Sequence, residues 1–130
     1  MSALDNRGIP LGYAFRREDE TTPRELDALQ RQGDATCPIV LDVRTHLEWD
    51  ICRLHGAKLI PLQDLERRLD ELKAELDDDL TRQIVVHCHH GRRSLTATYI
   101  MRAAGFTNVT SLAGGVHLWA RDIDVSMPTY

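Results

Sequence analysis

The sequence predicts an α/β fold in which helices cover both faces of a parallel sheet. Three observations lead to this fold class. Short runs of β-branched and apolar residues alternate with longer stretches whose apolar residues recur at helical spacing. The connections between these stretches are short, as is typical of strands that alternate with helices. The length of 130 residues suits one domain with its own buried core.

Residues 1–17 have no apolar period and are expected to form an irregular N-terminal lead-in. The folded domain is therefore assigned to residues 18–130. Its first helix should begin at Pro23, because Thr22 and Glu25 have the spacing of a capping box and proline is favoured in the first turn. The next glycine along the chain marks the expected end of this helix.

Residues 39–44 form the next apolar run and predict a strand. Asp42 and Arg44 stand at its C-terminal end, which is where a parallel sheet is expected to bind ligands. Thr45 and Glu48 repeat the capping-box spacing, so a short helix should follow this strand.

The most regular helix of the chain is predicted to follow a short strand over residues 58–61. Leucines recur there at steps of three or four positions, with charged residues between them. They are Leu62, Leu65, Leu69, Leu72, Leu76 and Leu80. An apolar stripe of this length beside a sheet is expected to pack on the core rather than on a second chain.

Residues 84–94 have the sequence IVVHCHHGRRS, in which an apolar run stops at a cysteine within a cationic loop. Residues 84–86 predict a buried strand, and Cys88 lies just beyond its C-terminal end. Gly91 permits a tight turn, and a helix is expected from Ser94 to the next glycine. The last predicted elements are a strand over 107–112 and a short helix over 116–121.

This arrangement predicts an activated thiol at Cys88. A helix that begins at the edge of a sheet offers free backbone N–H groups and a partial positive charge. Arg92 and Arg93 add formal positive charge in the same loop. Both effects favour the thiolate, so Cys88 is expected to be a nucleophile. Cys37 and Cys52 lack such surroundings and are expected to be small core residues.

Composition restricts the partners and the compartment. A net charge of −4 gives no support to nucleic-acid binding. The odd number of cysteines, three, argues against a disulfide framework and favours a reducing compartment. No apolar run reaches the roughly 20 residues of a membrane span. We therefore expect a soluble cytoplasmic protein with neither nucleic acid nor membrane as a partner.

Two other chemistries compete for the cysteine loop. A metal site would use Cys88 with its neighbouring histidines, but adjacent residues cannot all point at one ion, and no second group with ligand spacing is evident. No metal is therefore expected. Cysteine-dependent phosphatases and related arsenate reductases place five residues between cysteine and arginine, whereas four separate Cys88 from Arg93. The shorter loop makes a smaller cradle, which disfavours phosphate.

The loop from Cys88 to Ser94 fits the C-x-x-G-x-R-S pattern of the rhodanese family, and the chain resembles single-domain members over about residues 20–130. Motifs elsewhere agree with this resemblance. They are LDVR at 41–44, EW at 48–49, HGA at 55–57, IPL at 60–62, GF at 105–106 and LAGGV at 112–116. The resemblance implies a three-layer α/β/α domain around a five-stranded parallel sheet. Its first strand would be very short, near residues 19–22.

The resemblance also implies a sulfurtransferase that needs no cofactor. It would move a sulfane sulfur from a small donor such as thiosulfate, through a Cys88 persulfide, to cyanide, a thiol or an acceptor protein. The loop cradle for this sulfur would consist of His89, His90, Gly91, Arg92, Arg93 and Ser94. Arg44 is the candidate for holding an anionic donor, and Asp42 is expected to anchor Arg93. The alternative is a rhodanese-like binding or relay module that serves a protein partner.

Overall fold

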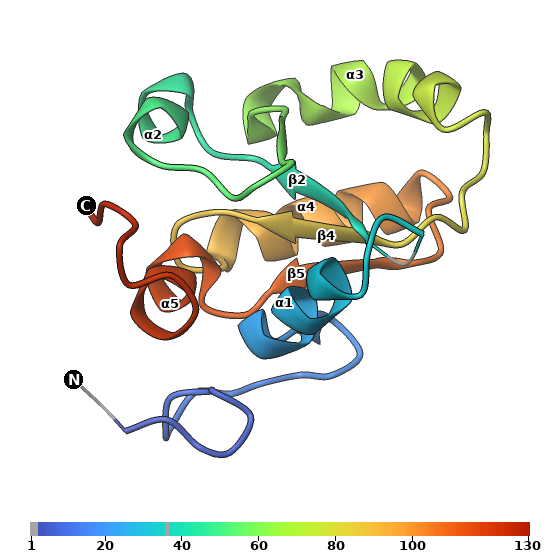
Figure 1. Ribbon diagram of the computed structural model, residues 1–130. Helices are drawn as coiled ribbons and strands as arrows, with labels where there is room; N and C mark the ends of the chain where they lie inside the picture. The colour runs from blue at the N-terminus through green and yellow to red at the C-terminus, as the bar shows by residue number, and fades with distance from the viewer. Residues whose placement is uncertain (1–2, 36) are drawn as a thin grey trace.

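The computed structural model describes residues 3–35 and 37–130 and shows three layers, with helices on both faces of one parallel sheet (Figure 1). Within these residues the sheet has five strands in the order β1-β5-β4-β2-β3. The strands are β1 (Glu20–Thr21), β2 (Ile39–Asp42), β3 (Lys58–Leu59), β4 (Ile84–His87) and β5 (Val109–Leu112). The helices are α1 (Pro23–Arg31), α2 (His46–Ile51), α3 (Leu62–Glu75), α4 (Arg92–Ala103) and α5 (Gly115–Asp122). The predicted fold class is confirmed.

Different helices cover the two faces of the sheet. Helices α3 and α4 pack together over one face, and α1 and α5 pack together over the other. Side chains of a strand alternate between the faces. Leu41 and Val86 accordingly pack with α3 and α4, whereas Val40 and Val85 pack with α1 and α5. Each face has its own apolar core, and the central strands are buried on both sides.

Both predicted capping boxes are present, and they define where α1 and α2 begin. The Glu25 N–H donates to Thr22 Oγ1 over 3.1 Å, and the Glu25 carboxylate accepts from the Thr22 N–H over 3.3 Å. The same reciprocal pair joins Thr45 and Glu48, at 3.2 and 3.3 Å. Each box satisfies two N–H groups that a helix start would otherwise leave unpaired, so local sequence alone sets these starts.

Helix α3 ends at Glu75, before its leucine stripe ends. Asp77 and Asp78 have φ values of 53° and 59°, in the left-handed region that stops a right-handed helix. Leu76 and Leu80 nevertheless pack against the core beneath α3 and α4, so the stripe follows burial through the turn. No helix in the described part of the chain, α3 included, is long and apolar enough to cross a membrane.

Three strands are shorter than their apolar runs predict. Strand β2 ends at Asp42, β3 ends at Leu59 and β5 begins only at Val109. Val43 and Ile60 are still buried although they lie outside the strands. An apolar run reports burial, and burial extends further along the chain than strand pairing does.

The short first strand implied by the resemblance is present as β1, which pairs with β5 at the edge of the sheet. Two residues carry too little pattern to be detected by periodicity. Residues 3–17, which precede this strand, form turns and a single bridge between Leu4 and Pro10. Ile9 is buried there against Ala113 and Leu118, so this segment is packed on the domain.

Candidate active site

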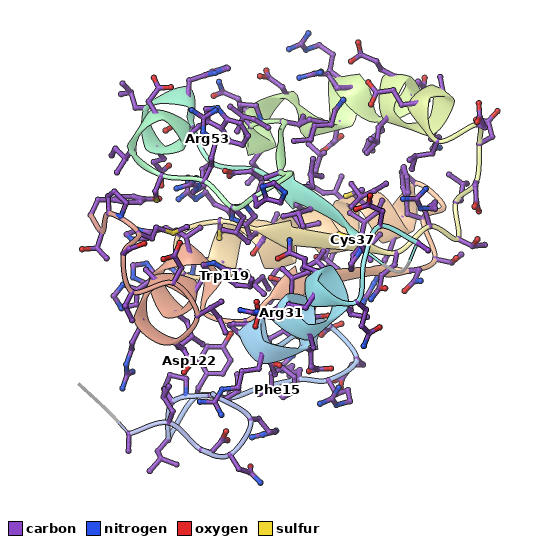
Figure 2. All side chains as sticks on the ribbon, in the orientation of Figure 1. Phe15, Arg31, Cys37, Arg53, Trp119 and Asp122 are labelled. Carbon is purple, nitrogen blue, oxygen red and sulfur yellow. The ribbon has the colours of Figure 1, made fainter. Side chains whose placement is uncertain are left out.

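The candidate active site lies at the C-terminal edge of the sheet, where β2 and β4 end side by side. Asp42 is paired with His87 in the register of these two strands. Cys88 directly follows β4, and a short loop leads from it into α4. Cys37 precedes β2 and so lies toward the opposite edge of the sheet (Figure 2). The topology therefore separates these two thiols.

The thiol of Cys88 is buried at the centre of the loop, with 1 % of the residue exposed. Its Sγ accepts hydrogen bonds from the backbone N–H groups of Gly91, at 3.1 Å, and of Ser94, at 3.3 Å. The hydroxyl oxygen of Ser94 lies 3.4 Å from Sγ and 2.7 Å from the hydroxyl oxygen of Ser111. These contacts hold the sulfur in one position.

The sulfur takes the place of a capping side chain at the start of α4. Ser94 is the third residue of this helix, and the N–H at that position is one that a capping oxygen normally accepts. Gly91 has a φ of 109°, a left-handed conformation that turns the chain into the helix, which begins at Arg92 rather than at the expected Ser94. Donors of this kind and the helix dipole favour negative charge on the sulfur.

The N-terminus of α5 holds the loop from the other side. The Val116 N–H donates to the Cys88 carbonyl over 2.9 Å, and the His117 N–H donates to the His89 carbonyl over 3.0 Å. Gly115 has a φ of 59°, and a Cβ at this position would lie 2.5 Å from both carbonyl oxygens. A larger residue would have to displace the loop, so this contact requires glycine.

Arg93 pairs with Glu48 and not with Asp42, which corrects the predicted partner. Two hydrogen bonds of 2.7 and 2.9 Å join its guanidinium to the two carboxylate oxygens of Glu48. The hydrogen bonds from Arg93 hold the pKa of Glu48 well below its usual range. Asp42 is not available because it is fully buried against Arg44. Glu48 therefore caps α2 and also anchors the cysteine loop.

Arg44 is a buried support of the site. Its charge is not available to an anionic sulfur donor, contrary to the expected role. Its side chain is completely buried and bonds both oxygens of Asp42 at 2.7 to 3.1 Å. The remaining N–H groups donate to the Cys52 carbonyl at 2.6 Å, the Cys52 sulfur at 3.7 Å and the Tyr130 hydroxyl at 2.8 Å. Burial opposes the charged form, but these bonds outweigh it and raise the pKa of Arg44. All five guanidinium donors are thus in use.

Arg92 is the loop arginine that keeps its charge available. It is the first residue of α4 and is exposed. Within residues 3–35 and 37–130, no hydrogen bond or ion pair to its guanidinium is formed. Of the three arginines named for this site, it alone is exposed and has no carboxylate partner within the described residues, so its guanidinium can meet an anion from solvent.

Tyr130 is a site residue that the sequence did not identify. Its hydroxyl accepts a hydrogen bond from Arg44 and donates one to a Glu48 oxygen over 2.7 Å, so it links these two residues. Its ring stacks on that of His89, with centroids 4.0 Å apart and planes 13° from parallel. A tyrosine in an irregular tail carries no local pattern, and only the fold brings it to the loop. Burial raises the pKa of its phenol.

Three histidines gather at the rim of the loop. His89 and His90 come from the loop itself, and His117 comes from α5. Ring centroids lie 4.0 Å apart for His89 and His90, 4.8 Å for His90 and His117, and 6.0 Å for His89 and His117. Burial and the neighbouring imidazoles lower the pKa of His89 and of His90. No local pattern in the sequence places His117 beside the loop, and only the fold brings it there.

A cavity of about 380 Å³ opens beside Arg93. The residues after β2, those at the start of α3 and Arg93 of α4 form its walls. They are Val43, Arg44, Thr45, His46, Pro61, Leu62, Gln63 and Arg93. Its volume is within the range of sites that bind small molecules.

Because His87 is buried, we expect the protein to lose stability measurably in mild acid. Its side chain is fully buried, and neither ring nitrogen has a hydrogen-bond partner in the described part of the chain. Burial lowers its pKa from 6.5 to about 4. Between these values the unfolded chain binds a proton that the folded chain does not. The free energy of unfolding should therefore fall as pH drops through this window, by about 3 kcal/mol in total.

Urea unfolding of the wild type and of a His87→Leu variant across this pH range checks the prediction. Groups far from His87 titrate equally in both proteins, so the difference between the two curves reports on His87 together with its neighbour Asp42. We expect the variant to lose less stability in acid than the wild type. Parallel curves would show that His87 does not contribute to the pH dependence.

The fold and the site together define a class of protein. It is an α/β domain in which a strand of a parallel sheet is followed directly by a cysteine. Backbone N–H groups at the start of the next helix donate hydrogen bonds to the thiol of this cysteine. A family model described as "Rhodanese-like domain" matches residues 22–122, and the chain belongs to this family. The resemblance found in the sequence is thereby confirmed.

Curated relatives are mostly longer proteins. The chain is 36% identical over 109 residues to the probable adenylyltransferase/sulfurtransferase MoeZ of Mycobacterium tuberculosis, which covers 84% of the chain and 26% of that protein. It is 33% identical over 95 residues to the putative sulfur carrier protein YrkF of Bacillus subtilis, covering 72% of the chain and 48% of YrkF. The chain thus spans about a quarter to half of the length of these relatives.

Solved structures give the same fold. The human single-domain sulfurtransferase TSTD1 is 27% identical with a TM-score of 0.68, and the match covers 79% of the chain and 96% of that protein. The reduced CoADR-RHD of Bacillus anthracis has a TM-score of 0.69 at 24% identity, with 86% of the chain and 18% of that protein covered. The second likeness concerns the fold alone.

Proposed function

We propose that this protein is a sulfurtransferase whose Cys88 takes up a sulfane sulfur as a persulfide and passes it to an acceptor. The observation that carries the proposal is the environment of the Cys88 sulfur. It accepts hydrogen bonds from the backbone N–H groups of Gly91 and Ser94 at the start of α4. The relatives named as sulfurtransferases support the same reaction.

In the first half-reaction the Cys88 thiolate attacks the outer sulfur of the donor. With thiosulfate, a bond forms between Cys88 Sγ and this sulfur, while the bond to the inner sulfur breaks. Sulfite leaves with the electron pair of the broken bond, and the enzyme carries a negatively charged persulfide. The covalent intermediate divides one transfer into two simpler steps. No other oxidant or reductant is needed.

In the second half-reaction a nucleophilic acceptor attacks the outer sulfur of the persulfide. The bond between the two sulfurs breaks, and the electron pair returns to Cys88 as a thiolate. Cyanide gives thiocyanate, and a thiolate gives a new persulfide. Backbone N–H groups that are already in place stabilise the charged sulfur without reorganisation, which is how fixed dipoles lower barriers.

Arg92 is the residue that we propose for attracting an anionic donor, in place of Arg44. Its exposed guanidinium stands at the first position of α4. Arg93 acts indirectly, because its pairing with Glu48 fixes the shape of the loop. This pairing also counts against phosphatase chemistry, since the bonds to Glu48 use two of the five donors of Arg93 and partly neutralise its charge.

A protein acceptor is the alternative to a small one. The 380 Å³ cavity beside Arg93 is of a size that could receive a short chain end or a small thiol. The putative sulfur carrier among the relatives agrees with transfer between proteins. Both acceptors would use the same Cys88 persulfide, so the first half-reaction is common to them.

Intact mass after incubation with thiosulfate tests the first half-reaction. We expect the protein to gain one sulfur atom and to lose it when cyanide is added. Digestion and peptide mapping should place the sulfur on Cys88, with Cys37 and Cys52 unmodified. If thiosulfate, and then a low-molecular-weight persulfide, leave the mass unchanged, a binding module would replace the sulfurtransferase as the better description.

A further inference from the structure

We propose that His89, His90 and His117 form a binding site for a divalent transition-metal ion of the Zn²⁺ class at the rim of the cysteine loop. The three side chains come from two separate segments, the loop after β4 and the start of α5. Only the fold unites them, and neither the sulfur chemistry nor the support of the loop uses their ring nitrogens.

The geometry of the ring nitrogens suits a shared ion. One ligand nitrogen from each histidine lies within 4.8 Å of the others. Zinc binds imidazole nitrogens at about 2.0–2.1 Å in tetrahedral geometry, so two ligands of one ion stand about 3.3 Å apart. The ring nitrogens must therefore approach by up to about 1.5 Å, which side-chain rotations can supply. Because His90 and His117 are exposed, such rotations meet little resistance.

The backbone that carries the three histidines is already held in place, so metal binding has to immobilise little more than their side chains. The His117 N–H donates to the His89 carbonyl over 3.0 Å, which ties α5 to the loop. The Tyr130 ring stacks on the His89 ring at a centroid distance of 4.0 Å. Tyr130 is itself fixed by its bonds to Arg44 and Glu48. A ligand set that is partly preorganised loses less conformational freedom on binding.

The ligand chemistry selects the class of ion. Three imidazoles suit zinc, nickel and copper, whereas calcium and magnesium need oxygen ligands that this cluster does not contain. Three protein ligands also leave a coordination position open, as in zinc sites that bind an exchangeable ligand. The objection from sequence, that adjacent histidines cannot all face one ion, is met because the third ligand comes from α5.

The thiol of Cys88 is not counted among the ligands. Its sulfur is buried and bonded to the N–H groups of Gly91 and Ser94, inside the loop rather than at the rim. The three histidines form the only group of this kind within residues 3–35 and 37–130. The proposed site is therefore distinct from the sulfur-transfer centre, although both share the loop.

Calorimetric titration of the reduced 130-residue chain with Zn²⁺ tests the site, in the absence of any sulfur donor. We expect one equivalent to bind, and we expect His117→Ala to weaken the affinity by about 100-fold or more, because losing a ligand should cost at least as much as losing a residue that orients one. His55→Ala is the matched control, since His55 is exposed and outside the cluster. Its affinity should equal that of the wild type.

A Cys88→Ser variant separates imidazole from thiolate ligation. It should still bind zinc, and its Co²⁺ complex should show no thiolate-to-metal charge-transfer band. Equal affinity in the wild type and His117→Ala would overturn the proposal, as would loss of binding in Cys88→Ser alone. Circular dichroism confirms that each variant is folded, and His90→Ala provides a second removal of a ligand. None of these readouts depends on sulfur transfer.

Discussion

Replacing Cys88 by alanine is expected to abolish the transfer of sulfur from thiosulfate to cyanide. The sulfur of Cys88 is the atom that would form the covalent intermediate. The two backbone N–H groups that stabilise its negative charge would have no nucleophile to stabilise in the alanine variant. Loss of a covalent nucleophile commonly lowers kcat by roughly 10⁴-fold or more. Thiocyanate formation measured under steady-state conditions checks this result.

Cys37→Ala is the matched control for this experiment. Cys37 lies before β2, toward the opposite edge of the sheet from Cys88. Its removal should leave the rate of thiocyanate formation close to that of the wild type. Substantial activity in Cys88→Ala would transfer the nucleophilic role to another residue and refute the proposed mechanism.

Removing the carboxylate of Asp42 is expected to cause the largest loss of stability among single changes at the site. Asp42→Ala leaves the Arg44 guanidinium fully buried without its anion. Breaking a buried ion pair by removing one partner typically destabilises a protein by about 3–5 kcal/mol. Urea unfolding at neutral pH measures this loss as a lower transition midpoint.

The exposed pair of Arg31 and Asp27 provides the comparison. These residues form an ion pair of 2.9 Å on the surface of α1, with the arginine side chain 76% exposed. Asp27→Ala should cost about 0.5 kcal/mol, because exposed pairs are well solvated. A paired replacement of Asp42 and Arg44 by leucine and methionine should recover part of the loss of Asp42→Ala. Similar losses for Asp42→Ala and Asp27→Ala would show that burial does not make the inner pair special.

The supports of the cysteine loop form a connected set. Arg93 binds Glu48, the Tyr130 hydroxyl donates to Glu48, and Arg44 donates to Tyr130. On the far side, the start of α5 bonds the carbonyl groups of Cys88 and His89. The position of the sulfur therefore depends on residues from β2, α2, α5 and the tail. Hydrogen-bonded sets of this kind are known to act together, so single changes need not be additive.

Features encoded within a few consecutive residues could be predicted from the sequence. The capping boxes at Thr22 and Thr45 marked two helix starts, because a cap depends only on residues three positions apart. The strand, thiol and glycine turn around Cys88 were readable for the same reason. The leucine stripe identified a buried face, although it could not show that α3 ends at Glu75.

The sequence by itself thus determined the α/β fold, the order of its elements and the position of the proposed nucleophile. The tertiary structure decided which charges and rings meet. It paired Arg93 with Glu48 across 45 positions, and it brought Tyr130 and His117 to the loop. Such contacts depend on burial and on the relative placement of separate elements, which local patterns do not encode. A buried guanidinium needs a buried counter-charge, so Arg44 pairs with Asp42. Arg93 pairs with Glu48 instead.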